Sequence, residues 1–345
     1  MNAESDTNEV RRSAGKIAVQ LAGFAIGLGL LAWTAREALK PENREPLSNL
    51  GDADPGVVAL LFGCSLATLV INGLIFWVVL RPEKKTPVSD MVATNAFTTM
   101  LAYLPFKLSL VARVALHNRR DGVPLLTIAA WFGAVGALIF VAMGPVSAAS
   151  LWRKGVDVWW WVGSLGGVGL CLGILLVAAG LLAHERGLQR IHAITDPLKI
   201  GPVNRFLRTE SFGKMHGVFG MLAHPWASIG ATGLRLLDIG VLTLRFLAAA
   251  WILDVELGWE QAVLFASTYF MIGMLSPFGM LGTREAGSIG VAGLLGFGDA
   301  GESLAVVILI VTASESLAYL FGGVLGGVWI RPDRLVRGVK AAAEL

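Results

Sequence analysis

The sequence predicts an all-α polytopic membrane protein with about six full transmembrane helices and two re-entrant helical hairpins of opposite orientation, arranged as an inverted repeat. Three observations support this fold class. Of the 345 residues, 55% are hydrophobic and only 15% are charged, whereas a soluble domain carries about 25% charged residues. Six apolar runs are long enough to cross about 30 Å of hydrocarbon. Two further apolar stretches are interrupted by proline.

The six uninterrupted runs belong to one predicted membrane domain, residues 17–330. They are 17–39, 57–80, 124–147, 160–183, 226–250 and 303–330. The polar residues 1–16 are predicted to be a disordered cytoplasmic tail, because they contain too little apolar surface to bury. Residues 331–345 are predicted to be a basic cytoplasmic tail.

The two interrupted stretches are 91–116 and 261–295. Pro105 breaks the first, and Pro277, Gly279 and Gly282 break the second. Proline removes a backbone hydrogen bond of a helix, and in a membrane such a break is tolerated only where protein or water satisfies the backbone. Each stretch is therefore either a kinked full span or a pair of half-helices that enters and leaves on one side.

The distribution of charged residues favours two re-entrant hairpins. With both hairpins re-entrant and the N-terminus in the cytoplasm, most lysines and arginines fall in cytoplasmic segments, as the positive-inside rule requires. The acidic residues then gather in the external loops. If only one stretch crossed the membrane, basic and acidic loops would share a side. Three spans separate the hairpins, so they enter from opposite faces, and 57–147 and 226–330 become inverted halves. We expect the cytoplasmic (inner) membrane as the location, with both termini in the cytoplasm.

The loop 184–224 is the longest basic segment between spans. Between Val203 and Phe219 its apolar residues recur at near-helical spacing, which predicts an amphipathic helix lying on anionic lipid. Docking of a protein partner is the alternative for this loop. The five histidines, which include His117 and His216, fall in this loop or at its side of the membrane and are expected to have surface roles.

No enzyme signature is present: the sequence contains no His-Glu-x-x-His, Gly-x-Ser-x-Gly or Walker motif. No histidines or cysteines stand at metal-ligand spacing. We therefore expect no catalytic activity, no metal, no cofactor and no nucleic-acid partner.

Ionisable residues at membrane depth are the candidates for function, because such residues are costly in lipid. They are Lys107, Arg113, Arg235, Asp238, Arg245, Arg284, Glu285 and Glu315. One interpretation is a set of buried ion pairs, joining Asp238 to Arg235 or Arg245 and joining Arg284 to Glu285 or Glu315. The other is substrate binding, favoured for Arg113 and Arg284 because each follows a proline break, where a half-helix end and a two-pronged guanidinium can hold phosphate. Lys107 either binds substrate or extends to the membrane surface.

A family resemblance adds to this interpretation. The segment Ser-Pro-Phe-Gly-Met-Leu-Gly-Thr-Arg-Glu-Ala-Gly, 276–287, resembles the Pro-Gly-Gly-Leu-Gly-x-Arg-Glu motif of the flippase-like membrane domain of lysylphosphatidylglycerol synthases. The segment Leu-Pro-Phe-Lys-Leu-Ser-Leu-Val-Ala-Arg, 104–113, looks like that family's Leu-Pro-Gly-Arg-x-Gly-Glu-x-x-Arg motif. The resemblance covers most of 17–330. It departs from the motifs at Phe106, Ser109, Leu110 and Phe278.

The resemblance implies movement of a lipid-linked headgroup between leaflets, with Arg284 and Glu285 matching one motif and Arg113 the other. The predicted substrate is an anionic or aminoacylated phospholipid or a lipid-linked glycan. The predicted contacts are Arg284, Glu285, Arg113, Lys107, Glu315, Asp238 and Arg235. The chain ends at Leu345, so we expect no aminoacyl-transfer domain and no synthase activity. Two alternatives stay open: a secondary transporter of a small ion or solute, and an accessory subunit of a membrane glycosyltransferase, with that enzyme or a second copy of the chain as partner.

Overall fold

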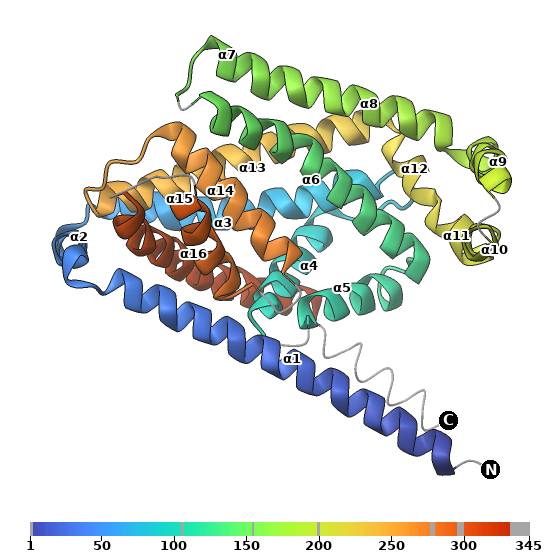
Figure 1. The fold of residues 1–345 in the computed structure, drawn as a ribbon, viewed down its shortest axis with the longest axis horizontal. Helices are drawn as coiled ribbons and strands as arrows, with labels where there is room; N and C mark the ends of the chain where they lie inside the picture. Colours follow the sequence, from blue (N-terminus) through green and yellow to red (C-terminus); the bar gives the residue numbers. More distant parts are fainter. Residues whose placement is uncertain are drawn as a thin grey trace. The chain divides into compact units, whose positions relative to one another are not determined.

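The computed structural model describes residues 3–104, 107–153, 155–198, 201–276, 280–294 and 300–331. Within these ranges all regular secondary structure is helical (Figure 1). Among the described residues, four helical segments are long and apolar enough to cross a membrane: α3 (Pro55–Leu80), α6 (Leu125–Arg153), Val158–Leu182, and Ser303–Ile330 of α16. The third consists of α7 (Val158–Trp161), a π turn and α8 (Gly167–Leu182). These segments confirm four of the six predicted spans.

The other two predicted spans are helical as well. Run 226–250 lies in α13 (Pro225–Ile252), which carries Arg235, Asp238 and Arg245 and is therefore less apolar than the four segments above. Run 17–39 lies in α1 (Ala3–Ala38). Because α1 begins at Ala3, its helical backbone runs through the segment predicted to be a disordered tail, and the structure differs from the prediction there.

Both interrupted stretches are helix–break–helix segments. The first consists of α4 (Val88–Met100), a 3₁₀ turn at Leu101–Tyr103 and α5 (Leu108–Arg119). The second consists of α14 (Trp259–Leu275) and α15 (Thr283–Leu294), which pack against each other (Figure 1). Helix α15 also packs against α1. Pro105, Pro277 and Gly279, the predicted helix breakers, lie outside the described residues.

The chain divides into two compact units. Unit 1 comprises residues 1–66, 98–112 and 242–321, and unit 2 comprises 67–97, 113–241 and 322–345. Helices α3, α4, α5, α13 and α16 contribute residues to both units. The second helix–break–helix segment therefore belongs to unit 1, whereas Arg113 and the 184–224 segment belong to unit 2.

The 184–224 segment contains a series of short helices rather than one amphipathic helix. They are α9 (His184–Thr195), α10 (Gly201–Leu207), α11 (Glu210–Met215) and α12 (Gly217–Leu222). Helices α11 and α12 pack against α6, and α12 also packs against α8. This packing buries His216, and His117 on α5 is buried too, with exposed fractions of 6% and 1%. The expected surface role is therefore wrong for these two histidines.

Candidate functional site

Four buried charged side chains in unit 1 form the candidate site, named here the Arg284 cluster: Arg245, Arg284, Glu285 and Glu315. Arg284 and Glu285 stand in the first turn of α15, Glu315 lies on α16, and Arg245 lies on α13. A charge buried in an apolar interior is tolerated only with partners of opposite sign. With all four ionised, the two arginines and two glutamates balance one another.

Within the Arg284 cluster, Arg284 and Glu315 each pair with two groups of opposite charge. Arg284 Nη1 donates to Glu315 Oε1 at 2.5 Å, and Arg284 Nε donates to Glu285 Oε1 at 3.0 Å. Arg245 Nη1 lies 2.9 Å from the second Glu315 oxygen, Oε2, as an ion pair outside hydrogen-bond geometry. Arg284 is thus held between two carboxylates, and Glu315 between two guanidinium groups.

Hydroxyl and aromatic groups complete the surroundings of Arg284. Its Cζ lies 4.4 Å from the centre of the Tyr269 ring, a distance at which the ring face attracts a cation. The Tyr269 hydroxyl is 2.8 Å from Thr312 Oγ1, which donates to Glu285 Oε1 at 3.0 Å. The Tyr103 hydroxyl donates to Glu315 Oε1 at 3.4 Å. These contacts orient the side chains of Arg284, Glu285 and Glu315.

Two glycines make room for Arg284. Gly282, directly before α15, has φ +79°, and a Cβ there would lie 1.7 Å from the carbonyl oxygen of Gly27 on α1. Only glycine fits both that backbone conformation and that contact. On α14, a Cβ at Gly273 would lie 3.3 Å from Arg284 Cδ. Gly282 thus permits close approach of α1 to the start of α15, and Gly273 permits close approach of α14 to the Arg284 side chain.

Not every polar atom in the cluster is satisfied. Within the part of the chain that the structure describes, Glu285 Oε2, Arg245 Nε and Ser288 Oγ are buried without a hydrogen-bond partner. Ser288 lies three residues after Glu285 on α15, so both side chains project from the same face of that helix. Buried polar groups are nearly always paired in native proteins. Glu285 and Ser288 thus present unsatisfied polar atoms on one face of α15.

Unit 2 contains a second buried ion pair, between Arg235 and Asp238 on α13. Arg235 Nη1 donates to Asp238 Oδ2 at 2.6 Å, and Arg235 Nη2 donates to Asn72 Oδ1 at 3.0 Å. The sequence offered Arg235 and Arg245 as partners of Asp238, and Arg235, three residues away, forms the pair. Arg245, the other, pairs with Glu315 instead.

Arg113 is buried in unit 2, with 8% of its surface exposed. Its Nη2 donates to Asn95 Oδ1 at 2.6 Å, and its Cζ lies 4.2 Å from the centre of the Phe76 ring. Asn95 in turn donates to the carbonyl oxygen of Leu69 at 2.8 Å. Arg113 and Arg284 thus belong to different units, each with its own set of partners.

Lys107 is the remaining predicted contact. It is exposed and has φ +47° in the turn that leads into α5. Its exposure distinguishes it from the other predicted residues, all of which are buried.

Sequence reasoning missed the neutral partners of these charges: Tyr103, Tyr269, Thr312, Asn72 and Asn95. A signal for part of this set was present on α16. Thr312, Glu315 and Tyr319 are spaced three and four residues apart, which places them on one face of an otherwise apolar helix. Such a polar stripe on a membrane helix indicates a buried polar neighbour.

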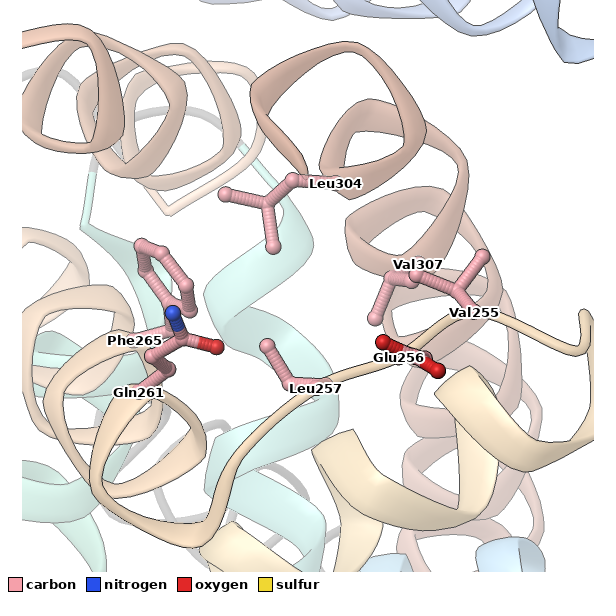
Figure 2. Close-up of a pocket in the computed structure, with 7 residues that line it drawn as sticks. All are labelled: Val255, Glu256, Leu257, Gln261, Phe265, Leu304 and Val307. Carbon is pink, nitrogen blue, oxygen red and sulfur yellow. The ribbon is translucent and has the colours of Figure 1, made fainter. Parts of the chain in front are cut away.

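A small pocket lies elsewhere in unit 1, where the 255–257 loop meets α14 and α16 (Figure 2). Its polar groups are Glu256 and Gln261, and its apolar wall includes Leu304 and Val307. Its volume of about 10 Å³ accommodates about one water molecule. This pocket is therefore too small for a lipid headgroup.

Comparison with known protein families matches residues 20–325 to the family described as lysylphosphatidylglycerol synthase TM region. No curated protein and no solved structure gives a significant match. The matched residues include every charged member of the Arg284 cluster and the segment 104–113, which ends at Arg113.

Proposed function

Because the chain belongs to the family of the lysylphosphatidylglycerol synthase TM region, which links this multi-pass membrane protein to lipid handling, we propose that it is a lipid flippase. It moves an anionic or aminoacylated phospholipid, or a lipid-linked glycan, between leaflets. It acts as a transporter rather than as an enzyme. Its membrane is the cytoplasmic membrane, with both termini in the cytoplasm.

The observation that carries this proposal is the position of Arg284 between two buried carboxylates. Guanidinium binds a phosphate diester in the same two-pronged geometry with which it binds carboxylate. A lipid phosphate can therefore replace Glu315 or Glu285 as the partner of Arg284. The exchange keeps the buried cation paired at each stage.

Glu315 lowers the energetic cost of this exchange, because it is also paired with a second cation, Arg245. Breaking a buried ion pair by removing one partner costs about 3–5 kcal/mol when the other charge is left alone. When Arg284 turns to a phosphate, Glu315 keeps Arg245 at 2.9 Å. When the lipid leaves, Glu315 is in place to take Arg284 back.

We propose that both helix–break–helix segments are re-entrant hairpins. We also propose that residues 57–147 and 226–330, which contain them, form inverted halves. The packing of α14 against α15 supports a hairpin in the second half. In transporters of this architecture the N-terminal end of a half-helix faces an anionic substrate group, because the helix dipole is positive there. Arg284 is the second residue of α15, which agrees with that arrangement.

In unit 2 we assign phosphate binding to Arg113. Its Nη2 donates to the amide oxygen of Asn95, and an anion can take the place of that oxygen at the same atom. Arg235 and Asp238 neutralise each other at 2.6 Å and serve the stability of the unit. Exposed Lys107 contacts headgroups at the membrane surface.

The 184–224 segment lies on anionic lipid in this proposal. Arg186 and Arg190 of α9 are exposed, and Ile194 of the same helix is 66% exposed. A helix that presents both basic and apolar side chains binds an anionic membrane surface. Binding of the segment to vesicles of phosphatidylglycerol but not of phosphatidylcholine would support this assignment.

The test of the proposed function uses the full chain in proteoliposomes. A fluorescent acyl-labelled phosphatidylglycerol is placed in both leaflets, and a membrane-impermeant reductant bleaches the outer one. Active protein lets bleaching proceed beyond the outer leaflet. Protein-free vesicles and vesicles with heat-inactivated protein set the baseline.

The assay is repeated with phosphatidylglycerol, aminoacylated phosphatidylglycerol and a lipid-linked glycan. Bleaching that stops at the outer leaflet with folded protein and all three lipids would contradict the proposal. Uptake of a soluble anion by the same vesicles would then favour a solute transporter.

A further inference from the structure

The two carboxylates of the Arg284 cluster differ in how completely they are bound. Glu315 uses both oxygens: Oε1 accepts from Arg284 at 2.5 Å, and Oε2 faces Arg245 at 2.9 Å. Glu285 uses one: Oε1 accepts from Arg284 Nε and from Thr312, while Oε2 has no partner among the described residues. Glu285 is also fully buried, with 0% exposed. One of the two acids therefore has a buried oxygen in position to take a proton.

We propose that Glu285 is a proton-binding site that couples movement of an anionic lipid to movement of a proton. The inference rests on the proposed flippase function and adds the ion that accompanies the lipid. The step is a simple protonation: a proton binds Oε2, the carboxylate becomes a carboxylic acid, and no other covalent bond forms or breaks.

Protonation changes the charge of the cluster from balanced to one net positive charge. In a buried site that excess attracts an anion strongly, because water does not screen it. Protonation also weakens the acceptor that Arg284 Nε uses, since a neutral carboxyl oxygen is a poorer acceptor than a carboxylate. Both effects favour exchange of Glu285 for a lipid phosphate at Arg284. Loss of the proton reverses them and expels the anion.

The charged groups near Glu285 come from three helices. Arg284 on α15 pairs with Glu285, and Glu315 on α16 pairs with both Arg284 and Arg245 of α13. The hydroxyl of Thr312 on α16 donates to Glu285 Oε1. Tyr269 on α14 and Tyr103 bring neutral hydroxyls. Where α1 meets the start of α15, the contact is with Gly27, which carries no charge.

Glu315 is the less suitable proton acceptor in the same cluster. Two guanidinium groups contact it, so a proton there would leave both without a full negative partner. A proton on Glu285 leaves Glu315 ionised and paired with both arginines. The geometry therefore favours Glu285 over Glu315 as the acid that takes the proton.

A proton that travels with a singly charged anionic lipid makes the transport electroneutral, so a pH gradient alone can drive it. The test uses wild-type proteoliposomes with fluorescent phosphatidylglycerol and an imposed gradient, acidic outside. Labelled lipid is expected to accumulate in the inner leaflet, up to about tenfold for each pH unit at one proton per lipid. Reversing the gradient should reverse the accumulation, and a protonophore should abolish it.

In the variant Glu285→Gln, which keeps an oxygen acceptor but cannot bind the proton, the lipid exchange that remains is expected to be independent of the gradient, with no accumulation in either leaflet. Glu42→Gln, the same change at an exposed acid, is the matched control and should behave as wild type. Lipid exchange that ignores the gradient in wild type would overturn the coupling while leaving the flippase function intact. Absence of any exchange in wild type would overturn the flippase function itself. The wild-type measurement decides the coupling even if Glu285→Gln fails to fold.

Discussion

Arg284 and Glu315 stand 31 residues apart in the sequence, and Arg284 Nη1 donates to Glu315 Oε1 at 2.5 Å inside unit 1. The bond ties the first turn of α15 to α16, and Arg245 reaches the other oxygen of the same carboxylate from α13. A single carboxylate thus connects three helices. The stability of unit 1 and the proposed exchange of partners both depend on it.

Replacing Glu315 by glutamine is expected to destabilise the protein by about 3–5 kcal/mol, because Arg245 loses its carboxylate in a buried position. Arg284 is less affected, since it keeps Glu285 at 3.0 Å. The double variant Glu315→Gln with Arg245→Met removes one charge of each sign and should recover most of that loss. Unfolding in detergent measures both. Equal stability losses in the single and double variants would show that Arg245 and Glu315 are not coupled.

Gly282→Ala is expected to destabilise the protein strongly, because the residue has φ +79° and the new methyl group would meet the Gly27 carbonyl oxygen. Gly290→Ala on α15 is the matched control. A Cβ there meets nothing within 4 Å, and alanine gains about 0.5–1 kcal/mol over glycine inside a helix. The midpoints of thermal unfolding of the two variants should move in opposite directions. A Gly282→Ala protein as stable as wild type would mean that α1 does not pack closely on this turn.

Asn95→Ala is expected to destabilise unit 2, since it removes the acceptor of Arg113 and the donor to Leu69 in one change. The loss should be about 2–4 kcal/mol, because one of the two hydrogen bonds involves a buried charge. Asn49→Ala, which removes a bond at 3.2 Å to the carbonyl oxygen of Leu253, is the control and should cost about 1 kcal/mol. Equal losses for the two variants would indicate that Arg113 does not depend on Asn95.

Acidification is expected to loosen the packing of α11 and α12 through His216. Burial lowers the pKa of His216 below its ordinary value of 6.5, against the opposing effect of a hydrogen bond to the Leu182 carbonyl. The unfolded segment therefore binds a proton more readily than the folded one, so stability falls as pH drops below about 6.5. Relative to the intrinsic amide exchange rate, which itself slows as the pH falls, hydrogen exchange of 210–222 should accelerate between pH 7 and pH 5. In His216→Phe, which keeps an aromatic ring beside Phe212 and Phe219, the acceleration should be much smaller. An unchanged acceleration in this variant would assign the effect to another group.

Apolar run length and proline placement predicted most of the helices, because membrane-crossing length and loss of a backbone donor are local properties of the chain. The breaks between α4 and α5 and between α14 and α15 follow from them. Pairing of charges could not be predicted in the same way. Arg245 had Asp238 seven residues away as a plausible partner, yet it pairs with Glu315, seventy positions further along. That choice depends on how α13 and α16 pack.

The amide partners were beyond sequence reasoning, because Asn95 is an ordinary residue until packing brings Arg113 against it. Thr312 was marked only by its place in the polar stripe of α16, and that stripe does not identify Glu285 as the group to which it donates. The short helices of the 184–224 segment differ from the single amphipathic helix predicted there, because packing of α11 and α12 against α6 overrides the regular apolar spacing. Local patterns thus predicted where polar chemistry lies, and packing determined its partners.

The central claim is that Arg284 binds the lipid phosphate by exchanging partners with Glu285 and Glu315. The most direct measurement is the rate of fluorescent phosphatidylglycerol exchange in proteoliposomes containing wild type, Arg284→Lys, Arg284→Ala, or Arg153→Ala. Arg153 is the last residue of α6, and its described ion pair is with Asp157, outside the Arg284 cluster, so its variant should match wild type. Arg284→Ala is expected to slow exchange by about 10–100-fold, the effect of losing one charge-assisted hydrogen bond, and Arg284→Lys by less. The variant Arg284→Met with Glu285→Gln, which keeps the buried charges balanced, should be folded and equally slow. Wild-type exchange rates in folded Arg284→Ala protein would contradict the claim.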